Sequence, residues 1–82
     1  MLVELSPKAA KYLRGLNEPV KSRIKAALEK LSFEPPQGDI RAMSGRDGYR
    51  MRVGGYRILF DMLADRVVVY DIAPRGQIYK GR

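Results

Sequence analysis

The sequence predicts a single α+β domain over residues 1–82: an N-terminal strand, a two-helix hairpin and an antiparallel β-meander, with the helices on one face of the sheet. Two changes of pattern support this fold class. Apolar residues recur at helical spacing up to residue 31 and alternate with polar residues from residue 40 onward. A Glu-Pro-Pro-Gln-Gly segment separates the two parts. A chain of 82 residues supports only one hydrophobic core.

The helical part follows a short apolar strand from Leu2 to Leu5. Ser6-Pro7 has the residue types of a helix N-cap and first helical position, and the first helix is predicted to run to about Leu16. Asn17-Glu18-Pro19 interrupts that pattern and starts the second helix. The apolar positions of the second helix share one face: Val20, Ile24, Ala27, Leu28 and Leu31.

Four strands are predicted in the second half of the chain. Their ranges are Ile40 to Met43, Tyr49 to Val53, Tyr56 to Met62 and Arg66 to Ala73. Gly54-Gly55 forms a two-residue hairpin turn, which sets the register of the strands beside it. The predicted cross-strand pairs are Val53–Tyr56, Arg52–Arg57, Met51–Ile58, Arg50–Leu59 and Tyr49–Phe60.

This register divides the residues between two faces of the sheet because side chains alternate along a strand. The predicted core face carries Tyr49, Met51, Val53, Tyr56, Ile58 and Phe60, and it continues into Val68, Tyr70 and Ile72. The opposite face, called the arginine face here, carries Arg50, Arg52 and Arg57. Val67, Val69, Asp71 and Arg75 are predicted to share the arginine face.

The charge of the chain favours a polyanionic partner. Sixteen Lys and Arg oppose nine Asp and Glu, which gives a formal net charge of +7. Eight of the ten arginines lie from Arg41 onward, and the planar guanidinium matches phosphate oxygens. For the charge of the whole chain, the alternative is a solvated surface that is basic without a specific partner. The helix lysines are interpreted as a solvated face, with contact to RNA as the less favoured role.

Arg52 directly opposite Arg57 would destabilise a sheet, so folding alone does not explain this pair. One explanation is that Asp61 or Asp71 lies between the arginines in a ladder of ion pairs. The favoured explanation is an anion-binding site. Tyr79, near the end of the chain, either packs on the sheet edge or stacks on an unpaired base.

The absence of cysteine and histidine excludes several classes of site. Disulfides, thiol catalysis, Cys-based zinc sites and histidine bases are all ruled out, and we expect no cofactor and no metal. The first residues do not resemble a signal peptide, and no apolar run approaches a membrane span. The sequence therefore predicts a cytoplasmic protein that does not act at a membrane.

Three segments resemble the RelE/ParE toxin superfamily of type II toxin–antitoxin systems. They are YRMRVGGYRILF (Tyr49 to Phe60), VVVY (67–70) and PRGQIY (74–79). The predicted order of strand, helices and sheet agrees as well, so the resemblance covers nearly the whole chain. The hairpin alone is moderately specific for this superfamily, and together with the Arg-x-x-Ile-Tyr ending it is strongly specific.

This resemblance implies an mRNA interferase, an endoribonuclease that cuts messenger RNA in the ribosomal A site without a metal. A ribose 2′-hydroxyl attacks the adjacent phosphate. It also implies a cognate RelB-like antitoxin that is acidic and folds on binding, with operator DNA contacted only through that antitoxin. The family's active-site positions match Arg50, Arg52, Arg57, Arg75 and Tyr79.

One departure from the family concerns proton transfer. Well-known RelE-like enzymes have lysines at the positions of Arg50 and Arg52, and arginine does not give up its proton. The general base is therefore unassigned, with Asp61 and Asp71 as the neighbouring carboxylates.

Two other functions remain open. A ParE-like toxin shares the fold and acts on DNA gyrase, and a non-catalytic chain would serve only within a toxin–antitoxin repressor complex. The arginines and Tyr79 favour the ribonuclease.

Overall fold

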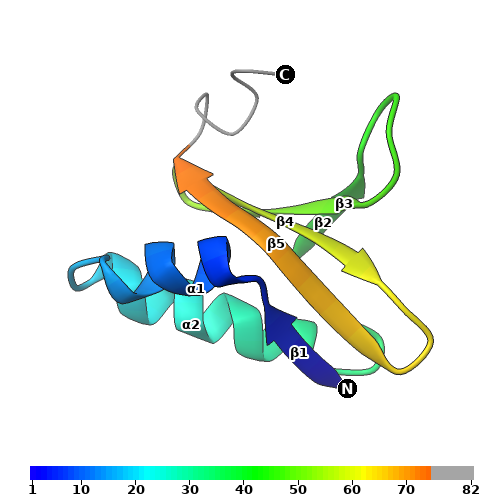
Figure 1. The fold of residues 1–82 in the computed structure, drawn as a ribbon, viewed down its shortest axis with the longest axis horizontal. Helices are drawn as coiled ribbons and strands as arrows, with labels where there is room; N and C mark the ends of the chain where they lie inside the picture. The colour runs from blue at the N-terminus through cyan, green and yellow to red at the C-terminus, as the bar shows by residue number, and fades with distance from the viewer. Residues whose placement is uncertain (75–82) are drawn as a thin grey trace.

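The computed structural model describes residues 1–74, which form two helices and one five-stranded sheet in the order β1-β5-β4-β3-β2 (Figure 1). The predicted α+β fold is confirmed, with both helices on one face of the sheet. The elements are β1 (Leu2–Leu5), α1 (Pro7–Arg14), α2 (Val20–Leu31), β2 (Asp39–Ala42), β3 (Tyr49–Val53), β4 (Tyr56–Met62) and β5 (Arg66–Pro74).

The start of α1 follows from its capping residues. The Ser6 hydroxyl oxygen accepts a hydrogen bond from the Ala9 backbone N–H at 3.1 Å, and proline occupies the first helical position. The helix ends at Arg14, two residues before the predicted Leu16. The second helix covers the predicted span and buries its predicted apolar face.

The sheet is antiparallel from β2 to β5, as predicted. The pairs between β3 and β4 have the predicted register, from Val53 opposite Tyr56 to Tyr49 opposite Phe60. Gly54, with a φ of 58°, makes the turn between them. The first strand lies parallel to β5 at one edge of the sheet. The helix hairpin provides part of the long connection that a parallel neighbour requires.

The core lies between the helices and the sheet face that they cover (Figure 1). Phe60 is fully buried, and its ring stacks on that of Tyr49 with centroids 5.7 Å apart. Other fully buried side chains include Ala9, Ile24, Leu31, Ile58, Val67 and Val69.

The predicted faces of β5 are wrong for its first half. Val67 and Val69 belong to the core, whereas Tyr70 packs with Leu59 on the arginine face. The cause is an irregularity in the pairing, in which Leu59 lies opposite Asp71 but Phe60 lies opposite Val69. The extra residue on β5 reverses the alternation between the two faces.

Candidate functional site

The arginine face lies on the side of the sheet away from the helices. Arg50 and Arg52 come from β3 and Arg57 from β4, and they alternate with core residues. Arg52 lies directly opposite Arg57, and Arg50 lies diagonally from it. The structure therefore brings three of the five predicted site residues to one face. Arg75 and Tyr79 lie outside the described residues.

A fourth arginine, which the sequence analysis did not include, joins this face from β2. Arg41 lies directly opposite Arg50, and its neighbour Ile40 packs against the core. Two like-charge pairs thus lie side by side on neighbouring strands, where each is unfavourable for folding. The alternation of apolar Ile40 with Arg41 could have placed Arg41 on the face opposite the core. The sequence did not show which residue of β3 lies opposite Arg41.

Asp39 partly neutralises the arginine face. Its carboxylate lies 3.2 Å from Nε of Arg52 and 3.7 Å from Nε of Arg41. These are not the ion pairs considered from the sequence. Asp71 pairs instead with Lys8 of α1 at 3.3 Å, and Asp61 makes no ion pair within residues 1–74.

Arg57 is the most unusual side chain on the arginine face because it is charged and only 7 % exposed. Its Nη1 donates a hydrogen bond to the Tyr56 carbonyl oxygen at 3.4 Å. Its Nε is buried without a hydrogen-bond partner in the described part of the chain. A buried donor left unsatisfied is unfavourable, and such groups often serve a ligand. A phosphate oxygen would supply both a negative charge beside the Arg57 guanidinium and a hydrogen-bond acceptor for its Nε.

Two oxygen-bearing side chains converge near Gly48, beside the start of β3. A Cβ at this position would lie 2.9 Å from Asp61 Oδ1 and 3.2 Å from the Tyr70 hydroxyl, so no other residue fits without a shift. Burial raises the pKa of Tyr70, although Arg46 opposes that effect. The hydroxyl is therefore protonated at neutral pH. Of the two candidate bases, Asp61 lies on the same face of β4 as Arg57, because the two residues are four positions apart along the strand. Asp71 forms an ion pair with Lys8.

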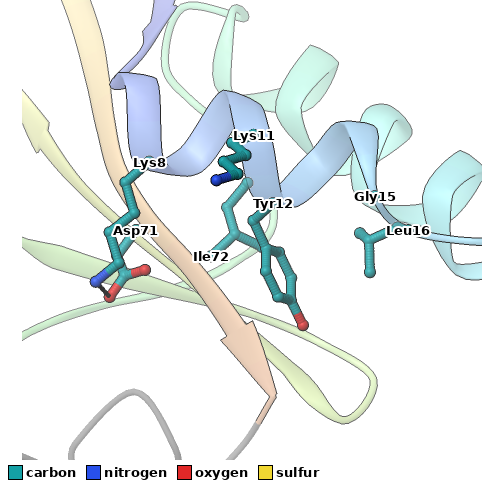
Figure 2. A pocket seen from close by; sticks show the side chains of 7 residues that line it. All are labelled: Lys8, Lys11, Tyr12, Gly15, Leu16, Asp71 and Ile72. Atoms are coloured by element: carbon teal, nitrogen blue, oxygen red, sulfur yellow. Dashed lines mark hydrogen bonds and ion pairs between the residues drawn. The ribbon is translucent and has the colours of Figure 1, made fainter.

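A groove lies on the helix side of the sheet, between α1 and β5, with a volume of about 570 Å³ (Figure 2). Tyr12 and Ile72 provide apolar surface, and the Lys8–Asp71 ion pair lies at one end. Burial raises the pKa of Tyr12. This helix groove suits an apolar side chain of a protein partner better than a phosphate. Its other lining residues are Lys11, Gly15 and Leu16.

Two further properties concern residues 1–74 alone. No three acidic, histidine or cysteine side chains gather there as they would around a metal ion. Neither helix is long and apolar enough to cross a membrane.

Comparison with known families found one match. Residues 3–79 match the family model described as the ParE toxin of the type II toxin–antitoxin system parDE. No curated protein matches the sequence significantly.

Solved structures of RelE proteins have similar folds. The archaeal RelE of the Pyrococcus horikoshii RelE–RelB complex is 24 % identical, with a TM-score of 0.77 over 93 % of this chain and 96 % of that one. The toxin of the Methanococcus jannaschii RelB–RelE complex is 25 % identical, with a TM-score of 0.76 over 93 % and 94 %. Isolated Escherichia coli RelE is 20 % identical, with a TM-score of 0.74 over 95 % and 89 %.

Proposed function

The chain belongs to the ParE toxin family of type II toxin–antitoxin systems. Within that family, we propose from the arginine face that it cleaves messenger RNA on the ribosome. The observation that carries the proposal is the buried Arg57 guanidinium, whose Nε has no partner among residues 1–74. Arg52 lies directly opposite it and adds positive charge. Folding does not require this arrangement, whereas a phosphate in the site would stabilise it.

The proposed reaction is an internal transfer at phosphorus. A ribose 2′-oxygen bonds to the adjacent phosphorus while the bond to the 5′-oxygen of the next nucleotide breaks. The 2′-hydroxyl proton leaves to a base and the 5′-oxygen gains a proton, which leaves a 2′,3′-cyclic phosphate. Negative charge builds up on the phosphoryl oxygens in between, and Arg57 donates to them from a site where water screens its charge little.

In this proposal, other side chains hold Arg52, accept the proton and stack on a base of the RNA. Asp39 holds Arg52 through its Nε, which leaves the terminal nitrogens of Arg52 to bind the phosphate in this proposal. Asp61 is the candidate base, because it lies on the arginine face without an ion pair among the described residues. Arg75 and Tyr79 stay predicted site residues, with Tyr79 stacking on a base beside the cut.

The second candidate is inhibition of DNA gyrase, favoured by the ParE description of the matching family. A gyrase inhibitor would leave message intact and cause DNA damage. A non-catalytic repressor component would cause no growth arrest when the chain is expressed alone. Growth arrest accompanied by cut message and undamaged DNA supports the ribonuclease against both.

Cleavage should require the ribosome. The chain has no histidine, and the arginines of the site cannot act as bases near neutral pH, so the reaction depends on alignment of the 2′-hydroxyl. A message held in the ribosomal A site supplies that alignment. Purified protein should cut ribosome-bound message rapidly and the same message in free solution poorly. Efficient cutting of naked RNA in the presence of a metal chelator would contradict this.

The antitoxin should cover the arginine face. We expect a RelB-like, acidic segment that orders on binding and lies over Arg50, Arg52 and Arg57, with operator DNA reached only through the antitoxin. Hydrogen exchange of the complex should show protection of β3 and β4 on binding. Protection confined to α1, α2 and the helix groove, around Lys8, Lys11 and Lys21, would contradict the prediction.

A further inference from the structure

A second groove, called the edge groove here, lies between α2 and β3, next to the start of the edge strand β2. Its volume is about 300 Å³, its lining includes Arg52 of β3, and the exposed Arg23 and Lys30 of α2 lie on its rim. Ala27 and Met51 form part of its floor. Arg52 also belongs to the arginine face, so the arginine face and the lining of this groove share one residue.

The rim of the edge groove carries excess positive charge. Arg23 and Lys30 are seven residues apart, so they lie on one side of α2 about 10 Å apart along its axis. Neither makes an ion pair with another residue of the described range 1–74, and both are exposed. Asp39 is the one carboxylate in the lining, and it is shared between Arg52 and Arg41.

The floor is built from small and apolar groups. Ala26 and Ala27 leave space between the two cations of α2. At Gly38 a Cβ would fall 2.2 Å from Cε of Met51, and φ is 132°, so glycine allows the segment before β2 to pack closely on β3. That packing brings Asp39 next to Arg52. The lining has no aromatic side chain to anchor a protein partner.

We propose that the edge groove binds the sugar–phosphate backbone of RNA that continues from the arginine face. Arg23 and Lys30 each contact a phosphate, and Arg52 joins this path to the cleavage site. A groove with spaced cations and no apolar anchor is suited to follow a charged backbone without reading its sequence. The inference rests on the proposed ribonuclease function and adds a binding subsite to it.

The test measures RNA binding directly, apart from cleavage. The probe is a fluorescent single-stranded RNA of 12 nucleotides with 2′-O-methyl sugars throughout, which cannot be cut by 2′-hydroxyl attack. Its Kd is measured by anisotropy over a range of salt concentrations for wild type and for Arg23→Ala/Lys30→Ala. The matched control is Arg14→Ala/Lys25→Ala, which also removes one exposed arginine and one exposed lysine, both outside the edge groove.

The groove variant should bind the probe about tenfold more weakly at low salt. Its slope of log K against log salt should be shallower by about 1.4, because two phosphate contacts are lost at about 0.7 each for single strands. The control should change Kd by less than about threefold, and both variants should melt like wild type. On ribosome-bound message, the groove variant should raise KM and leave kcat unchanged.

Equal weakening in the two variants would overturn the inference, because the effect would then follow net charge alone. Loss of antitoxin binding with unchanged affinity for the probe would overturn it in favour of a protein partner. Failure of the wild type to bind the probe would also overturn it. If the probe binds as expected but ribosome-bound message is not cut, the edge groove stands and the proposed ribonuclease fails.

Discussion

Arg57→Ala should lower cleavage of ribosome-bound message by about a hundredfold or more, which is typical for removing one donor from a site that stabilises a developing oxyanion. Arg57 is 7 % exposed as a residue, so its charge is little screened by water. Arg57→Lys should recover only part of the rate, because an ammonium does not reproduce the two-pronged guanidinium. The measurements are growth arrest and cleavage of ribosome-bound message.

Folding of the Arg57→Ala protein has to be checked separately. Loss of the packed aliphatic stem destabilises the fold, while removal of a buried cation opposite Arg52 relieves repulsion and an unsatisfied donor. We expect these effects to offset each other to within about 1 kcal/mol. Arg14→Ala, an exposed arginine on α1, is the matched control and should cut at the wild-type rate. A folded Arg57→Ala protein with wild-type activity would disprove the role of the arginine face in catalysis.

Phe60→Ala should unfold much of the protein. Phe60 is fully buried in the core and stacks on Tyr49. Truncating a buried phenylalanine typically costs about 3–5 kcal/mol, and the stability of an 82-residue domain is itself about 4–12 kcal/mol. Thermal melts should show a fall in Tm of more than about 12 °C.

Phe33, the other phenylalanine of the chain, is the matched control for Phe60. It follows α2 and is 47 % exposed, so Phe33→Ala removes the same side chain from the surface. Its Tm should stay within a few degrees of wild type, since exposed substitutions change stability by about 0.5 kcal/mol or less. Equal losses of Tm in the two variants would show that Phe60 is not a principal core residue.

Local chemistry in the sequence was sufficient for much of the fold. Ser6 and Pro7 start α1, and the Gly54-Gly55 turn sets all five pairs between β3 and β4. Because side chains alternate along a strand, that register also assigned Arg50, Arg52 and Arg57 to one face. The proposed roles of these residues, and those of Arg75 and Tyr79, remain predictions.

Tertiary structure decided the features that depend on contacts distant in sequence. The irregular pairing of β5 moves Val67 and Val69 into the core, and no local signal marks it because several valines in a row suit either face. The pairing of Asp39 with Arg52 depends on the register between β2 and β3, which a longer loop leaves open. The sequence by itself therefore determined that Arg50, Arg52 and Arg57 share a face, whereas the register of β2 added Arg41. The burial of Arg57 and the position of the Asp39 carboxylate beside Arg52 were decided by the tertiary structure. Both depend on contacts between residues that are distant in sequence, and local sequence patterns do not predict such contacts.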